Sequence, residues 1–327
     1  MTLTPEAVRI WRAEMSGRMA EAAGGLEPLQ VQPLPPGMGV VIAAVRDEIT
    51  HLPHFLRHHR AAGVRRFAFI DNGSVDGTLP YLRAQPDCDV YRHRGDYLLS
   101  AASAVWRNLL LERYASAGWC LSIDADEAAV YPGWPARGLD DFAATMRAGG
   151  RRVVNSIMVD MYGPGPVLNA NPGPDGDLLA ACPLFDSDGY TMEMPADWRG
   201  DRFPRLNIRG GPEMRAIRPR PRPEFGWLAK MALVLEPGIL YRDPHTVYPF
   251  ELNFDEPRMA LLHFRFFSAI AAKLARIHER RATPGAVAAY DLVAAQLQAD
   301  PGFSFAYPGS VEFRSPEQLV QQGLISL

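Results

Sequence analysis

The chain has 327 residues, 47% of them apolar and 22% charged, which is ordinary for a globular protein with a substantial core. A formal net charge of −3 argues against nucleic acid or an anionic membrane as the main partner and leaves only peripheral membrane association open. Three cysteines far apart in the sequence do not indicate a disulfide framework or a cysteine-based zinc site. We find no signal peptide and no apolar run of the ~18–20 residues that span a bilayer, so we expect a cytoplasmic protein.

Lysine is rare in this chain. Lys230 and Lys273 are the two lysines among 34 basic residues. Together with abundant alanine and proline, this scarcity indicates a GC-rich genome and not a function.

Residues 1–38 are predicted to form an arm and a linker that precede the main domain. Thr4 and Pro5 are typical of a helix start, and apolar residues recur at helical spacing as far as Ala23. Residues 24–39 are rich in glycine and proline, which predicts a linker.

A repeating strand–helix pattern begins at Val40. The run to Val45 is β-branched and alanine-rich, as expected for a strand buried on both faces of a sheet, and it is followed by a predicted helix at 49–62 and a strand at 67–70. A β-α-β order implies a right-handed crossover and a doubly wound α/β sheet. The later predicted elements are strands at 90–93, 153–161, 239–241 and 259–267 and helices at 101–117, 139–148, 269–281 and 286–297.

The second strand runs into the polar segment Asp71-Asn72-Gly73-Ser74. Asn72 and Gly73 tolerate positive φ, so this segment predicts a tight turn. Its position after a strand of an α/β sheet supports a nucleotide-binding role as well as a purely structural one.

A second acidic segment, Asp124-Ala125-Asp126-Glu127, follows the apolar run at 119–123, which has the length and residues of a strand. If Ala125 keeps the chain extended, Asp124 and Asp126 point the same way, because side chains alternate along a strand. Two hard oxygen ligands aimed at one point suit Mg²⁺ or Mn²⁺. A solvated acidic turn is the alternative interpretation.

These segments in this order resemble the family 2-like glycosyltransferases with the GT-A fold, in the bacterial branch with an Asp-Asn-Gly-Ser loop and an Asp-x-Asp-Glu motif. The resemblance covers residues 39–325 and includes Leu261-Leu262-His263-Phe264-Arg265-Phe266. It implies a mixed, mainly parallel central sheet flanked by helices. It also implies a nucleotide-sugar half at 39–135, an acceptor half at 136–266 and a helical C-terminal closure at 267–327.

The resemblance further implies roles for single residues. Glu127 would support Asp126 or touch the acceptor, and Asp126 would hold the metal. Asn72 stands where the commoner pattern has an acid, so it leaves open which side chain meets the base. The residues that would bind the nucleotide sugar are Ala44, Val45, Arg46, Asp71, Asn72, Asn108, Asp124 and Ala125, with Asp124 also at the metal.

Three further residues of the second half are candidates for the site. Glu213 lies where family 2 enzymes keep their catalytic base, with an exposed loop acid as the alternative. His263 and Arg265 share one face of a strand by alternation, so His263 can bind the metal and Arg265 the departing diphosphate.

Two more segments leave their role open. A late histidine often completes the metal shell in this fold, so His245 is a second candidate, although a buried histidine is more often structural. The Arg–Pro alternation at 218–222 could bind a diphosphate or an anionic acceptor, or form an extended spacer.

The sequence thus predicts a glycosyltransferase that uses Mn²⁺ or Mg²⁺ and moves a sugar from a UDP-, GDP- or TDP-linked donor to a glycan or other hydroxyl acceptor, with inversion. One alternative is a binding module for glycans or nucleotides without turnover. Another is a nucleotidyltransferase, which would need a glycine-rich basic loop after the first strand, and Arg46-Asp47-Glu48 is not such a loop.

Overall fold

The computed structural model describes residues 4–195, 204–217, 227–276 and 284–327. The Arg–Pro alternation at 218–222 therefore lies outside the described residues. So does the end of the helix predicted at 269–281.

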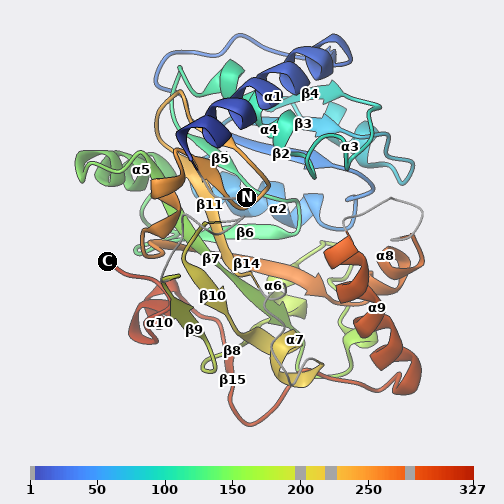
Figure 1. Ribbon diagram of the computed structural model, residues 1–327. Coiled ribbons are helices and arrows are strands. Elements are labelled where there is room, and N and C mark those ends of the chain that lie inside the picture. Colours follow the sequence, from blue (N-terminus) through green and yellow to red (C-terminus); the bar gives the residue numbers. More distant parts are fainter. Residues whose placement is uncertain (1–3, 196–203, 218–226, 277–283) are drawn as a thin grey trace.

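One large mixed sheet forms the centre of the protein, and its strand order is β1-β4-β3-β2-β5-β11-β7-β14-β6 (Figure 1). Its first half is parallel, as the strand–helix pattern predicts, and consists of β2 (Val40–Val45), β3 (Phe67–Asp71), β4 (Cys88–Arg92) and β5 (Cys120–Ser122). In the second half, β7 (Val153–Tyr162) and β14 (Met259–Phe266) keep this direction, while β11 (Ala229–Val234) and β6 (Glu127–Val130) run against it.

Smaller strands extend this sheet or form separate pairs. β8 (Leu184–Asp186) pairs with β7 and with β15 (Ser310–Glu312). The separate pairs are β9 (Thr191–Glu193) with β10 (Asn207–Arg209), and β12 (Leu240–Tyr241) with β13 (Val247–Tyr248).

Helices cover both faces of the sheet because successive side chains of each buried strand point to opposite sides. Val41, Ala43 and Val45 belong to an apolar core that also includes residues of α2 (Leu52–Ala61), α3 (Thr78–Arg83), α5 (Leu139–Ala148) and α10 (Pro316–Gln321). Val40 and Ile42 pack with α4 (Ala104–Tyr114) on the other face, and α1 (Pro5–Gly24) lies against α4 through Met15 and Met19. The helix predicted for the arm is therefore confirmed, with Thr4 as its N-cap.

The remaining helices lie beyond β7 and β14. α8 (Ile270–Arg276) and α9 (Pro284–Ala299) pack on the ends of these strands around Tyr162 and Phe266. Short helical turns occur at α6 (Leu178–Ala181), α7 (Gly211–Ala216), Val167–Asn169 and Phe250–Phe254. No helix in the described ranges is long and apolar enough to cross a membrane.

Two sequence predictions about local structure are wrong. The predicted linker contains β1 (Glu27–Gln30), which pairs with β4 and is the edge strand of the sheet, so the segment belongs to the sheet. An edge position explains how Pro28 is tolerated in a strand. The segment from Asp124 to Asp126 is also not extended, because Ala125 and Asp126 form a turn in which the amide of Glu127 donates to the carbonyl of Asp124 at 3.1 Å.

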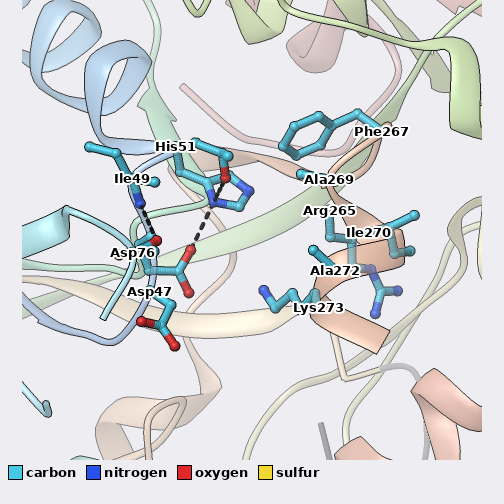
Figure 2. A pocket seen from close by; sticks show the side chains of 12 residues that line it. Asp47, Ile49, His51, Asp76, Arg265, Phe267, Ala269, Ile270, Ala272 and Lys273 are labelled. Atoms are coloured by element: carbon cyan, nitrogen blue, oxygen red, sulfur yellow. Dashed lines mark hydrogen bonds and ion pairs between the residues drawn. The ribbon is translucent and has the colours of Figure 1, made fainter. Parts of the chain in front are cut away.

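A cavity of about 170 Å³ opens between the loop that follows β2 and helix α8 (Figure 2). Asp47 and Glu48 lie on the loop side, and Lys273 lies on the helix side. The cavity therefore lies between the loop after β2, the first strand of the α/β pattern, and helix α8, which follows β14.

Candidate active site

Polar side chains gather at one edge of the sheet. The parallel strands β2, β3 and β5 end there, at Val45, Asp71 and Ser122. Because β11 and β6 run in the opposite direction, they begin at this same edge and deliver Lys230 and Glu127. The strand ends of open α/β sheets are where ligands usually bind.

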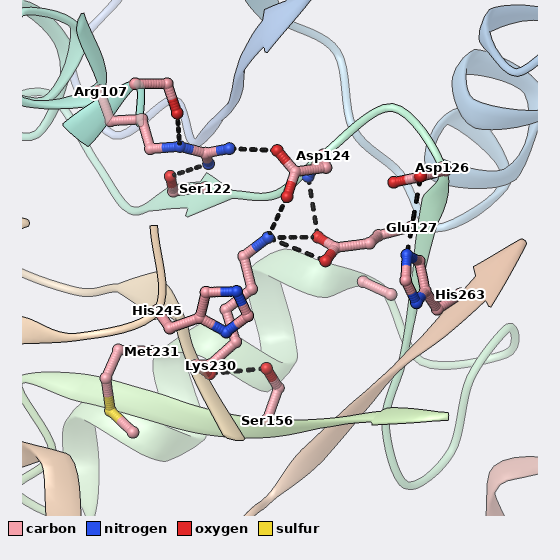
Figure 3. Close-up of polar contacts among 12 residues, drawn as sticks. Arg107, Ser122, Asp124, Asp126, Glu127, Ser156, Lys230, Met231, His245 and His263 are labelled. Atoms are coloured by element: carbon pink, nitrogen blue, oxygen red, sulfur yellow. Dashed lines mark hydrogen bonds and ion pairs between the residues drawn. The ribbon is translucent and has the colours of Figure 1, made fainter. Parts of the chain in front are cut away.

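Asp124 contacts two cations of the chain. Its carboxylate accepts hydrogen bonds from the Arg107 guanidinium and, at 2.7 Å, from Lys230 Nζ (Figure 3). Lys230 also donates to both carboxylate oxygens of Glu127, at 2.8 and 2.7 Å, and the backbone amide of Asp124 donates to Glu127 Oε2 at 2.8 Å. The side chains of Lys230 and Arg107 are fully buried. This cluster fixes the start of the acidic turn.

The charges of this cluster shift two carboxyl pKa values in opposite directions. Burial alone would raise the pKa of Asp124, but Lys230 and Arg107 hold it below its usual value. Burial raises the pKa of Glu127, and Lys230 offsets this only in part, since the Asp124 carboxylate adds to the increase. Asp124 is therefore a firmly ionised acid, whereas Glu127 is the more easily protonated of the two.

Asp126 belongs to a second polar group on the other side of the turn. Its Oδ2 accepts a hydrogen bond from Lys273 Nζ at 3.0 Å and lies 3.6 Å from His263 Nε2. The other ring nitrogen of His263 contacts Asp160 Oδ1 at 2.7 Å. Because the turn directs Asp124 to Lys230 and Asp126 to His263, the predicted convergence of the two acids on one point does not occur (Figure 3).

Arg265 links this second polar group to Glu213, which is far from it in the sequence. Its guanidinium contacts Asp160 Oδ2 at 3.2 Å and also pairs with Glu213, at the start of α7. Arg265 and His263 both reach Asp160, which confirms the prediction that they share one face of β14. Glu213 is buried in this network, so it is not the exposed loop acid of the alternative interpretation.

The neighbouring carboxylates change the pKa of His263. Burial alone would lower this pKa, but Asp126 and Asp160 raise it to about 9. The imidazole is therefore positively charged at neutral pH in the absence of other ligands. Lys273 and Arg265 add two further cations to this group, so its acids are balanced by charges of the chain itself.

The sequence interpretation missed the two lysines. Each of them contacts the acidic turn, Lys230 through Asp124 and Lys273 through Asp126. Their scarcity was itself a signal, because a chain that otherwise uses arginine keeps its two lysines at one site. Lysine presents a compact charge with three donors, which suits contacts with several carboxylate oxygens at once.

The Asp71 loop is a tight turn at the same edge. Asp71 is buried, and its Oδ2 accepts hydrogen bonds from the amides of Gly73 and Ser74 at 3.1 and 3.2 Å. Among the described residues, Asp71 Oδ1 is buried without a hydrogen-bond partner. A buried carboxylate oxygen without a partner is costly, which makes this atom a candidate ligand contact.

The side-chain amide of Asn72 hydrogen-bonds to the backbone of the protein. Its Nδ2 donates to the carbonyls of His93 and Gly95, at 2.8 and 3.0 Å, and so ties the loop to the end of β4. Asp71 is thus the side chain of this loop with a carboxylate oxygen that no described residue hydrogen-bonds, and the predicted contact of Asn72 with the base stays a prediction.

The end of β2 lies beside this loop. Val45 is buried and its carbonyl accepts a hydrogen bond from the Asn72 amide at 2.9 Å, while Ala44 is half-buried and Arg46 is exposed. Ala125 is buried inside the acidic turn. The structure thus brings the predicted nucleotide-contacting backbone of β2 next to Asp71.

Two predicted site residues instead have structural partners. Asn108 is buried, and its amide group makes two hydrogen bonds with the backbone of Tyr241, at 2.9 and 2.6 Å. His245 contacts the carbonyl of Ala229 at 3.1 Å, and burial and the Lys230 charge lower its pKa to about 4. His245 and His263 lie on opposite sides of the acidic cluster (Figure 3), so His245 does not complete a metal shell with His263.

Within the described ranges, no three histidine, cysteine or carboxylate side chains are grouped so that they could hold a metal ion by themselves. Asp126 and His263 lie 3.6 Å apart, and Asp160 orients the imidazole through its other ring nitrogen at 2.7 Å.

Comparisons with known proteins give the chain no family. No family model matches it, and no curated protein matches it. A solved structure that it resembles is a protein from Bacillus anthracis assigned as a glucose-1-phosphate thymidylyltransferase, in complex with a sucrose. The match has 6% sequence identity and a TM-score of 0.27, and it covers 87% of this chain and 93% of that chain. A likeness of this degree does not bear on function.

Proposed function

We propose that this chain is a glycosyltransferase that moves a sugar from a nucleotide-diphosphate donor to a hydroxyl acceptor. The observation that supports this best is the acidic turn at the end of β5, with Lys273 and Arg265 on its accessible side. Their side chains are 21% and 17% exposed, and that of Asp124 is 39% exposed, whereas Lys230 is fully buried. A ligand can therefore reach these two cations and the turn.

In this reaction the acceptor oxygen forms a bond to the anomeric carbon while the bond from that carbon to the phosphate oxygen breaks. The electron pair stays on the diphosphate, and the acceptor proton passes to a carboxylate. Lys273 and Arg265 would stabilise the charge that develops on the diphosphate. We assign the proton acceptor to Glu213, which Arg265 links to this group, whereas both oxygens of Glu127 accept hydrogen bonds from Lys230.

The metal that the resemblance implies fits the second polar group in part. Asp126 and His263, whose Oδ2 and Nε2 atoms lie 3.6 Å apart, would hold Mn²⁺ or Mg²⁺. Such an ion supplies Lewis-acid stabilisation of the leaving diphosphate. Asp124 is engaged by Arg107 and Lys230, so we assign it a role in holding the turn and not in ligation.

The test is nucleotide binding by wild type and by Asp126→Asn, which keeps the shape of the side chain. UDP-, GDP- and TDP-sugars are screened by thermal shift with and without Mn²⁺, and the best donor is then measured by calorimetry. We expect the variant to fold and to lose the Mn²⁺-dependent part of binding. Glu256→Gln, at an exposed acid, serves as the control and should bind as wild type does.

Other results would contradict the proposal. Binding by Asp126→Asn with unchanged metal dependence would refute the metal assignment. Release of pyrophosphate from a nucleoside triphosphate and a sugar phosphate would instead identify a nucleotidyltransferase. Binding of a nucleotide sugar without turnover on any hydroxyl acceptor would favour a binding module.

A further inference from the structure

The cavity between the β2 loop and α8 has two polar ends of opposite charge. Asp47, Glu48 and Asp76 line the loop side, while Lys273 and Arg265 line the other (Figure 2). A ligand that fills this cavity therefore meets hydrogen-bond acceptors at one end and cations at the other.

The acidic end is held in place by the backbone around it. Asp76 accepts hydrogen bonds from the amides of Ile49 and Thr78, at 3.1 and 3.0 Å, and Asp47 accepts one from the amide of Val75 at 2.7 Å. Glu48 Oε2 contacts His51 Nδ1 at 2.8 Å. Asp76 can accept further hydrogen bonds, since the two oxygens of a carboxylate offer about four acceptor positions. Neutral hydroxyl groups are the donors that suit such a wall without adding charge.

Between the two ends the wall is apolar. Phe267, Ile270, Ala269 and Ala272 line this part. The flat, weakly polar faces of a sugar ring pack on aromatic and aliphatic side chains in this way, while the ring hydroxyls point outward to polar groups.

The basic end adjoins the acidic turn. Lys273 lines the cavity and also donates to Asp126 Oδ2 at 3.0 Å, and Arg265 is linked to the same group through Asp160. An anionic group bound by Lys273 at this end would therefore sit between the cavity and the turn.

We propose that this cavity binds the six-membered ring of a phosphate-linked sugar, with its hydroxyls toward Asp47, Glu48 and Asp76 and its phosphate toward Lys273 and Arg265. The inference rests on the proposed function, which it deepens by assigning the sugar of the donor a position and a neutral hydroxyl-bearing character. The same chemistry also occurs in a free sugar 1-phosphate.

The experiment fills the cavity from α8. Ala272→Phe places a ring at a lining position, while Ala271→Phe changes an exposed alanine of the same helix outside the lining. Calorimetry compares UDP with UDP-glucose, GDP with GDP-mannose, and TDP with TDP-glucose, and adds glucose 1-phosphate alone. If Ala272→Phe does not fold, the smaller Ala272→Leu replaces it.

We expect wild type and Ala271→Phe to bind one nucleotide sugar about tenfold more tightly than its nucleoside diphosphate, a difference of about 1.4 kcal/mol. Ala272→Phe should remove this preference and change the affinity for the diphosphate by less than about twofold. An unchanged preference in Ala272→Phe, or an equal loss for both ligands, would overturn the assignment.

The remaining measurements distinguish a nucleotide sugar from a free sugar phosphate as the ligand. They also distinguish failure of the cavity assignment from failure of the proposed function. Binding of glucose 1-phosphate that Ala272→Phe abolishes, without any sugar transfer from nucleotide sugars, would uphold the cavity and overturn glycosyl transfer. Sugar transfer by wild type with an unaltered preference in Ala272→Phe would uphold the proposed function and overturn the cavity. Binding of none of these ligands to wild type would overturn both.

Discussion

Replacing Lys230 by methionine tests whether this buried lysine holds the acidic turn together. Methionine nearly preserves the volume of the side chain, so the change mainly removes the charge. The carboxylate of Glu127 then stays buried beside Asp124 without the ammonium that contacts both of its oxygens at 2.8 and 2.7 Å. Breaking a buried ion pair by removing one partner costs about 3–5 kcal/mol of the free energy of unfolding, and we expect a loss of this size.

The assay is urea denaturation of wild type, Lys230→Met, Glu127→Gln and the double variant at pH 7. Removing both charges should recover most of the loss, because no uncompensated carboxylate remains at position 127, and a coupling of about 2–3 kcal/mol is expected. Lys273→Met is the matched control. Its side chain is 21% exposed and Asp126 keeps His263 nearby, so we expect a loss of only about 1 kcal/mol.

The pH dependence gives an independent check. Burial already raises the pKa of Glu127, and without Lys230 this pKa rises further. A carboxyl group whose pKa is higher in the folded than in the unfolded state binds protons preferentially when folded, so the deficit of Lys230→Met should shrink as the pH falls from 7 to 5. A loss below about 1 kcal/mol at pH 7, or the same loss in the single and double variants, would refute this account of the cluster.

The remaining predictions concern stability and nucleotide affinity. Burial lowers the pKa of His58 to about 4, so its contribution to stability is complete above pH 6.5 and is lost as the pH falls through 4, a total decrease of roughly 3 kcal/mol. His58→Gln should flatten this part of a urea-denaturation pH series, and an unchanged slope would contradict the assignment. Gly39→Ala should destabilise the protein by about 1–3 kcal/mol in thermal or urea unfolding, because the added Cβ would lie 1.9 Å from an atom of the Trp119 ring. In contrast, the Cβ added by Gly17→Ala in α1 meets no atom within 4 Å, so this variant should be more stable than wild type by about 0.5–1 kcal/mol. Asp71→Ala should weaken binding of the nucleoside diphosphate and of the intact donor by the same amount, roughly 1–3 kcal/mol. If the variant binds both ligands as tightly as wild type does, the loop is only a turn.

The sequence alone predicted the parts of the fold that depend on local pattern. The uninterrupted apolar run of Val40–Val45 defined a buried strand, because a strand covered on both faces needs apolar side chains on both. Alternation along Met259–Phe266 correctly placed His263 and Arg265 on one face, since the period of a strand is two residues whatever it pairs with. The acids after β5 were likewise correctly located at the strand ends.

Which side chains meet was decided only by the tertiary structure. Lys230 reaches Asp124 because β11 pairs antiparallel with β5, and Glu213 reaches the site through Arg265 on β14. Neither contact could be predicted from the residues near it in the sequence, because strand pairing brings together segments that are far apart in the chain. The same holds for Asp124 and Asp126, which a turn and two separate sets of cations direct apart although a single residue separates them in the sequence.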